Sequence, residues 1–430
     1  MTVAVGTGSI DITPPRGLDI AGGLWAAPSL GVRDPLHARA LVLDDGATRA
    51  ALVTLDVIGL ERDTVLRARE LIAGAVGIPG EHVLIACSHT HQGPATLRYA
   101  ATSWPQAYME ELPRRIADVV ATAAGTMAPA EWAYAQAEQG TLAHYRRAKL
   151  RNGRVRNTWL LLPDDPVVGP AGDIDPRLPL LAFRTGDRLQ ALFANFACHA
   201  TCAGDGRWSA NYPGYFAASL AERLGLASSR IFYTSGAAAN TNPLVADAAE
   251  FGTQLAAVVP PALLSVQWRT GAHLRIRERA ISLPARRIDR FPFDLIAEAY
   301  QPKFSQLNFG RVVKYYADEY VKLVERGPVP TQTALQLVAL DDVALLAIPG
   351  ELFVELGREI QGRSPFAHTI VVTMANDWVG YIPHRAAFEE GGYETIFGSQ
   401  SRLAPEAGDM IVDAAVRLLD DTAGQRSHDE

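Results

Sequence analysis

The sequence predicts one large α/β domain in which mixed β-sheets are flanked by helices. Two observations lead to this prediction. Short apolar segments with the character of strands alternate with amphipathic segments of helical length along much of the chain. No Gly-, Pro- or Ser-rich linker interrupts this alternation, and no segment repeats. We therefore expect a single domain over residues 1–420, followed by a polar C-terminal tail over residues 421–430.

The first third of the chain supplies the clearest elements. Two apolar segments, 40–43 and 50–55, flank Asp44-Asp45-Gly46, which is typical of a β-hairpin turn. Residues 62–75 and 108–124 have helical periodicity, and the apolar segment 83–86 between them predicts a short buried strand.

The remaining elements follow the same pattern. The predicted strands cover residues 189–196, 231–234, 343–348 and 369–373. The predicted helices cover residues 215–224, 249–264 and 407–419, and another begins after Glu351. Residues 145–176 are rich in Gly, Pro and Arg, and we expect a long functional loop there.

Composition narrows the class of protein. Of 430 residues, 48% are hydrophobic, which excludes a disordered chain, and 40 basic against 47 acidic residues give a net charge of −7. This mild acidity argues against a nucleic-acid partner. Three cysteines make no disulfide framework and fit a reducing compartment. The first residues lack the pattern of a signal peptide, and no apolar run reaches the length of a membrane span. We expect a cytoplasmic protein without a membrane anchor; its oligomeric state is left open.

Polar residues gather where apolar strands end, which is the usual place of a site in open α/β sheets. In Ser88-His89-Thr90-His91 the two histidines are two positions apart, so on an extended segment they point to the same face. They can share one metal ion, or one can bind it while the other serves the reaction. The alternative is a polar loop after a core strand.

Two further strand ends carry candidate ligands. His199 follows the strand 189–196, where a histidine can be structural or can bind a metal. Cys198 and Cys202 lack a second cysteine pair that would complete a thiolate site, so we interpret them as packing residues. Glu351 follows Pro349-Gly350 and begins a helix. Its carboxylate either interacts favourably with the helix dipole or completes a His-His-Glu metal site with an open position.

Six segments in order carry a resemblance to a known family. They are Ile10-Asp11-Ile12-Thr13-Pro14-Pro15, Asp34-Pro35-Leu36-His37-Ala38-Arg39-Ala40, Ser88-His89-Thr90-His91, Ser209-Ala210-Asn211-Tyr212-Pro213-Gly214, Pro349-Gly350-Glu351 and Gly380-Tyr381-Ile382-Pro383. With these segments the chain resembles the catalytic region of neutral, non-lysosomal ceramidases, and more closely the shorter bacterial proteins that share this region.

The resemblance implies a zinc ion held by four residues: His89, His199, Glu351 and Tyr381. It implies that His91, Tyr393 and an arginine of Tyr145-Arg146-Arg147 stabilise the substrate carbonyl as it becomes an oxyanion. Arg146 matches better than Arg147, although the two neighbours leave the register open. Whether a second, structural metal ion is bound is also open.

Three departures from the family pattern bear on the substrate. Arg33 stands where a histidine is frequent, Asn211 where an aspartate is common and Ala239 where a glycine is usual. We therefore expect a zinc-dependent hydrolase that cleaves an amide bond of a small soluble substrate, rather than a true ceramidase. The alternatives are an ester or lactone hydrolase, an acyl-transfer or ring-closing enzyme, and a non-catalytic binding protein.

Overall fold

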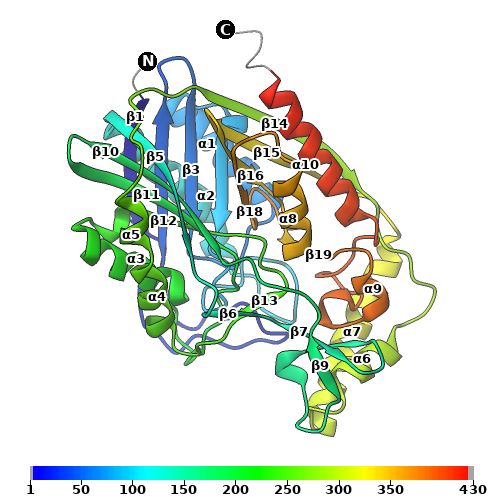
Figure 1. Ribbon diagram of the computed structural model, residues 1–430. Helices are drawn as coiled ribbons and strands as arrows, with labels where there is room; N and C mark the ends of the chain where they lie inside the picture. Colours follow the sequence, from blue (N-terminus) through cyan, green and yellow to red (C-terminus); the bar gives the residue numbers. More distant parts are fainter. Residues whose placement is uncertain (1–2, 425–430) are drawn as a thin grey trace.

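A computed structural model describes residues 3–424 and places two β-sheets face to face between two layers of helices (Figure 1). Apolar side chains of both sheets form the central core, among them Leu41 and Leu43 of the larger sheet and Val338 and Leu345 of the smaller one. The predicted fold class, a mixed α/β domain with helices on the outside, is confirmed.

The larger sheet has eight strands in the order β12-β11-β10-β5-β1-β2-β3-β4. They are β1 (Val3–Asp11), β2 (His37–Asp44), β3 (Arg49–Leu55), β4 (Val83–Cys87), β5 (Ala128–Glu138), β10 (Arg177–Thr185), β11 (Arg188–Phe196) and β12 (Ile231–Ser235). The β3–β4 and β11–β12 pairs are parallel and the other neighbours are antiparallel. The pairing of β2 with β3 confirms the predicted hairpin.

Two groups of helices cover the outer face of this sheet. Helices α1 (Arg62–Val76) and α2 (Gln106–Gly125) pack on β1, β2, β3 and β4. Helices α3 (Asn211–Leu224), α4 (Ala248–Ala257) and α5 (Val259–Leu263) pack on β10, β11 and β12. The single helix expected over 249–264 is therefore wrong. It is divided because Pro260 and Pro261 lack the N–H that a helix interior requires.

The smaller sheet has the order β14-β15-β16-β18. Its strands are β14 (Leu274–Leu283), β15 (Thr331–Leu340), β16 (Val343–Ala347) and β18 (His368–Val372), of which β16 and β18 are parallel. Helices α8 (Val354–Gly362) and α10 (Ala407–Ala423) pack on its outer face. Helix α10 extends past the domain boundary expected at residue 420, and residues 425–430 of the expected tail lie outside the described residues.

Short elements gather at the end of the sheets where β4, β11 and β16 finish (Figure 1). They include paired strands β6 (Ala143–Tyr145) with β13 (Thr241–Pro243), β17 (Glu351–Leu352) with β19 (Tyr381–Ile382), and the sheet β8 (Val155–Asn157), β7 (Arg147–Leu150), β9 (Val167–Pro170). Helices α6 (Phe293–Tyr300), α7 (Gln306–Arg326) and α9 (Ala387–Glu390) and the 3₁₀ turns η1 (Gly80–His82), η2 (Thr158–Leu160), η3 (Ser228–Arg230) and η4 (Tyr393–Thr395) complete the described fold.

Residues 145–176 do not form the long loop that their composition predicted. They build the small sheet of β7, β8 and β9, in which β7 pairs with both of the other strands. In the described part of the chain, no helix has both the length and the apolar character that a membrane crossing requires.

Candidate active site

The predicted site residues come from strand ends that are far apart in the sequence. His89 lies two residues beyond β4, and His199 lies three residues beyond β11. The segments that carry them meet, since Thr90 bridges to Ala200. Glu351 begins β17 and pairs with Tyr381 of β19 in parallel register. The fold therefore brings together the four residues that the resemblance implied as ligands.

Backbone carbonyl groups determine which ring nitrogen of His89 and of His199 is left without a hydrogen bond to the backbone. Nδ1 of His89 lies 2.8 Å from the carbonyl oxygen of Ile58, and Nδ1 of His199 lies 2.6 Å from that of Ala238. A carbonyl oxygen can only accept a hydrogen bond, so each Nδ1 carries the proton and each Nε2 keeps a lone pair. This is the arrangement that metal-binding histidines adopt.

Glu351 points a carboxylate oxygen at both free nitrogens. Its Oε2 lies 3.6 Å from Nε2 of His89 and 3.5 Å from Nε2 of His199, while its Oε1 accepts a 3.1 Å hydrogen bond from the Trp378 indole. The Oε2 atom is buried and accepts no hydrogen bond from a described residue.

These atoms fit a metal ion. Two imidazole nitrogens with lone pairs and one ionised carboxylate oxygen make a donor set suited to zinc. A buried carboxylate oxygen without a hydrogen bond is costly unless a further partner binds it. His89, His91 and His199 have ligand atoms within 4.8 Å of one another, so the group can hold a metal ion, whose identity the donor set alone does not fix.

His91 stands beside this group and is half-buried. Its Nε2 lies 3.3 Å from Nε2 of His89, and its backbone N–H donates to the Ala200 carbonyl. Burial and the nearby histidines lower the pKa of His91 well below its usual range, so the ring is neutral. Gly22 has a φ of 90°, and a Cβ there would lie 2.2 Å from Nδ1 of His91, so this position accepts only glycine.

The two neighbouring arginines face different ways. Arg146 donates to Tyr381 Oη at 3.1 Å and lies 3.2 Å from Nε2 of His199. Arg147 is fully buried and donates to the Gly391 carbonyl at 3.0 Å and to Glu390 at 3.0 Å, away from the histidines. Of the two, Arg146 is the one that contacts the residues at the predicted metal site.

Glu394 holds both arginines. It is fully buried, and its carboxylate accepts hydrogen bonds from Arg146 at 2.8 Å, from Arg147 at 2.9 Å and from the Asn157 amide at 2.7 Å. Burial alone would raise the pKa of Glu394, but the two guanidinium groups outweigh it and lower that pKa. The carboxylate is therefore ionised and fixes the position of Arg146.

A cavity of about 350 Å³ opens beside the histidines, and we call it the aromatic cavity. His91, Arg146, Tyr381 and Tyr393 line it. Its other aromatic walls are Trp25, Trp159, Tyr300 and Phe304. The rings of Tyr381 and Tyr393 meet edge to face at 5.7 Å. Burial raises the pKa of Tyr393, so its hydroxyl keeps a proton that it can donate.

The sequence did not reveal the supporting contacts of two residues, Glu394 and Trp378. Glu394 lies in a polar stretch in which three glutamates occur close together, and nothing in the spacing singles it out. Trp378 lies in the core and contacts the site through the hydrogen bond that its indole donates to Glu351.

The three departures from the family pattern lie in different environments. Ala239 packs in a cluster with Phe353 and Tyr381, close to the site. Asn211 is buried and exchanges hydrogen bonds with the Cys202 backbone, and Arg33 pairs with Asp205 at the surface. Only the departure at Ala239 therefore packs against a residue of the site.

The fold is that of the neutral ceramidases of known structure. Neutral ceramidase from Pseudomonas aeruginosa superposes with a TM-score of 0.75 and 18% identity, over 98% of this chain and 75% of that one. A second structure, of a ceramidase complexed with C2, gives a TM-score of 0.71 and 18% identity over 98% and 76% of the respective chains. No protein-family model and no curated protein sequence matches this chain.

Proposed function

We propose that this protein is a zinc-dependent hydrolase that cleaves an amide bond of a small substrate. The carrying observation is the convergence of His89, His199 and the unpartnered Glu351 oxygen beside a cavity that also holds Arg146. The similarity in fold to neutral ceramidases supports the proposal, because those proteins act on an amide by name.

His89, His199 and Glu351 would hold the ion, with Tyr381 as a fourth ligand. Zinc supplies an activated water molecule near neutral pH and polarises a carbonyl group. Metal binding and the hydrogen bond from Arg146 use the same lone pair on Nε2 of His199, so they are alternatives. Metal binding would thus free one Arg146 N–H for the substrate.

The remaining residues would act on the carbonyl oxygen of the substrate. Arg146, the Tyr393 hydroxyl and the His91 ring all line the aromatic cavity and can donate hydrogen bonds into it. Donors that are already oriented stabilise the negative charge that develops on this oxygen, which is usually the largest contribution in acyl transfer. Glu394 keeps Arg146 oriented without touching the substrate.

The aromatic cavity also indicates the kind of substrate. Its volume of about 350 Å³ is at the lower end for small-molecule pockets. Rings such as Trp159 and Phe304 offer apolar contact for a short acyl or aromatic group. We therefore propose a small amide as substrate, rather than a ceramide with two long chains.

The metal content of the purified protein tests the proposal first. Wild type is expected to carry about one zinc ion per chain, and His199→Ala is expected to lose it together with activity. His273→Ala removes an exposed histidine at the start of the small sheet and serves as the matched control, which should retain the metal. A wild type without metal, after growth with ample zinc and no chelator, would contradict the proposal.

A substrate panel tests the bond that is cleaved. Short N-acyl and N-aryl amides, the corresponding esters and lactones, and a long-chain ceramide are compared with and without chelator. We expect chelator-sensitive turnover that is highest for a short amide. Turnover confined to esters would refute the proposal that an amide is cleaved. Turnover confined to the ceramide would refute the proposal that the substrate is small.

His91→Ala separates catalysis from metal binding. Because His91 is assigned to the substrate oxygen, the variant should keep its zinc and lose turnover by about 100-fold. Loss of zinc from this variant would instead make His91 a ligand.

A further inference from the structure

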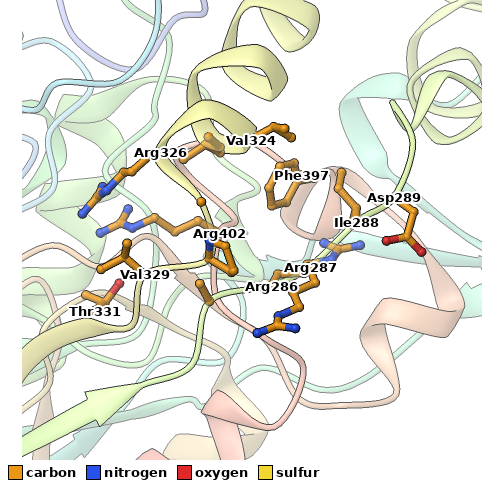
Figure 2. A pocket seen from close by; sticks show the side chains of 14 residues that line it. Arg286, Arg287, Ile288, Asp289, Val324, Arg326, Val329, Thr331, Phe397 and Arg402 are labelled. Atoms are coloured by element: carbon orange, nitrogen blue, oxygen red, sulfur yellow. The ribbon is translucent and has the colours of Figure 1, made fainter.

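A second cavity, of about 320 Å³, lies between the C-terminal end of α7 and the segment that follows β14 (Figure 2). Four arginines line it: Arg286, Arg287, Arg326 and Arg402. We call it the arginine cavity. None of its lining residues belongs to the aromatic cavity, so the two are separate sites.

The four arginines are not neutralised by carboxylates. None of them forms an ion pair with a residue of the described range 3–424. Arg286 donates to the Thr395 carbonyl at 2.6 Å, and Arg402 donates to the Ser399 carbonyl at 2.7 Å. Carbonyl oxygens satisfy N–H groups but leave the charge of a guanidinium uncompensated. Elsewhere in the described chain, buried arginines such as Arg39 pair with a carboxylate.

The charges are also crowded. In Figure 2 the guanidinium groups of Arg326 and Arg402 lie next to each other, with Arg286 and Arg287 across the cavity. Burial lowers the pKa of Arg402 and the nearby Arg326 lowers it further, while the carboxylates of Asp377, Glu61 and Glu319 oppose this without reversing it. Asp377 already accepts hydrogen bonds from Thr333 and backbone N–H groups. Burial lowers the pKa of Arg286 to about 10 without any carboxylate to oppose it.

The rest of the lining is mainly apolar. Val324 and Val329 are 50% and 51% exposed, and Phe397 and Ile288 lie along the same cavity. Asp289 is the one acidic residue in the lining, and its side chain is exposed at the rim of the cavity in Figure 2. The cavity thus combines a cluster of positive charge with an apolar wall.

We infer that the arginine cavity is a binding site for a small amphiphilic anion, a carboxylate or phosphate attached to a short apolar chain. The planar guanidinium group matches the two oxygens of a carboxylate or phosphate. Arg326 and Arg287 are exposed and can close on such a group from opposite sides, while Val324 and Val329 contact the chain. The volume lies within the range of small-molecule pockets.

Calorimetric titration of the full chain tests this inference. The probes are octyl phosphate, octanoate, 1-octanol and inorganic phosphate, each kept below concentrations at which it aggregates. We expect both octyl anions to bind, and both octanol and inorganic phosphate to bind at least about tenfold more weakly. If octanol bound as tightly as the octyl anions, the arginine charges would not contribute to binding. If inorganic phosphate bound as tightly, the apolar wall would not contribute.

Single variants locate the binding. Arg326→Gln and Arg287→Gln change exposed side chains and should each weaken octyl phosphate binding by about tenfold. Arg188→Gln changes an exposed arginine at the start of β11, outside the cavity lining, and should bind as wild type does. Failure of octyl phosphate to bind wild type, or unchanged binding in both cavity variants, would overturn the inference.

Discussion

Two groups of arginines in this protein differ in how their charge is balanced. Behind the candidate active site, Arg146 and Arg147 share the buried carboxylate of Glu394. In the arginine cavity, four guanidinium groups have no carboxylate partner among the described residues. A compensated arginine is held in one position and can serve as a fixed hydrogen-bond donor. An uncompensated one retains its charge for a ligand from outside. The contrast therefore separates Arg146 and Arg147, which support the candidate active site, from the arginines of the cavity, which we infer bind an anion.

The largest expected effect comes from breaking the compensated group. Glu394→Gln leaves Arg146 buried without a carboxylate and Arg147 with Glu390 alone, so the free energy of unfolding should fall by about 3–5 kcal/mol. Urea unfolding measures it. Glu131→Gln breaks the more exposed pair with Arg184 and should cost less than about 1 kcal/mol. Similar losses in both variants would contradict the distinction.

The pH dependence sharpens the same test. The folded-state pKa of Glu394 lies below the ordinary value of 4.5, so its contribution is fully present above pH 4.5. The contribution is lost as the pH falls through the folded-state pKa, because the native carboxylate then takes up a proton. The stability difference between wild type and Glu394→Gln should be constant near pH 7 and shrink well below pH 4.5. A difference independent of pH would rule out the ionised carboxylate.

Arg146→Met should mainly affect turnover. Removing a donor oriented towards the substrate oxygen should lower kcat by about 100- to 1,000-fold while zinc stays bound. Arg147→Met alters the neighbour that points away from the histidines. Its main effect should be a lower free energy of unfolding, and its effect on kcat should be smaller than that of Arg146→Met. Steady-state kinetics and urea unfolding of both variants decide the matter. If Arg147→Met impaired kcat as strongly, the assignment of Arg146 would be wrong.

Trp378 links the two regions, since its indole donates to Glu351 and Arg402 lies 5.7 Å from its ring centre. Trp378→Phe removes the hydrogen bond that orients the proposed ligand and should weaken zinc affinity by about 10- to 100-fold. Competition with a chelator measures this affinity. Trp208→Phe removes a comparable indole hydrogen bond, to the Pro15 carbonyl, and should leave the affinity unchanged.

The smallest expected effect is on stability at the arginine cavity. Arg326 is exposed and has no carboxylate partner among the described residues, so Arg326→Gln should change the free energy of unfolding by less than about 0.5 kcal/mol. Urea unfolding beside the titration with octyl phosphate compares stability with binding. A loss comparable to that of Glu394→Gln would mean that Arg326 is structural.

The sequence was informative where a strand is short, apolar and followed by a polar cluster. The strands before His89, His199 and Glu351 were all predicted, and those residues do meet. No element was predicted between residues 265 and 342, where β14, α7 and β15 lie. Helix α7 buries Val312, Tyr315, Tyr316 and Glu319, which are spaced as one face of a helix, so the sequence carries a helical pattern there that the prediction did not use. The arginine cavity is built from this region and was therefore not foreseen.

The partners within the site could not be predicted for a different reason. Glu394 reaches Arg146 across 248 residues, and the carbonyl oxygens that orient His89 and His199 belong to the backbone of Ile58 and Ala238. Such contacts depend on tertiary packing, because neither a residue type nor a spacing marks a particular carbonyl. The ligand set itself, including Tyr381, rested on resemblance to a family.

The wide spacing of the four proposed ligands has a consequence during protein synthesis. His89 emerges from the ribosome long before Glu351 and Tyr381, and β17 and β19 must pair before both reach the histidines. A nascent chain thus cannot assemble the full donor set, and the ion would be acquired after folding is nearly complete. Because a metal ion held by all four residues would bind the native state and not the unfolded chain, it would add to the free energy of unfolding of the finished protein.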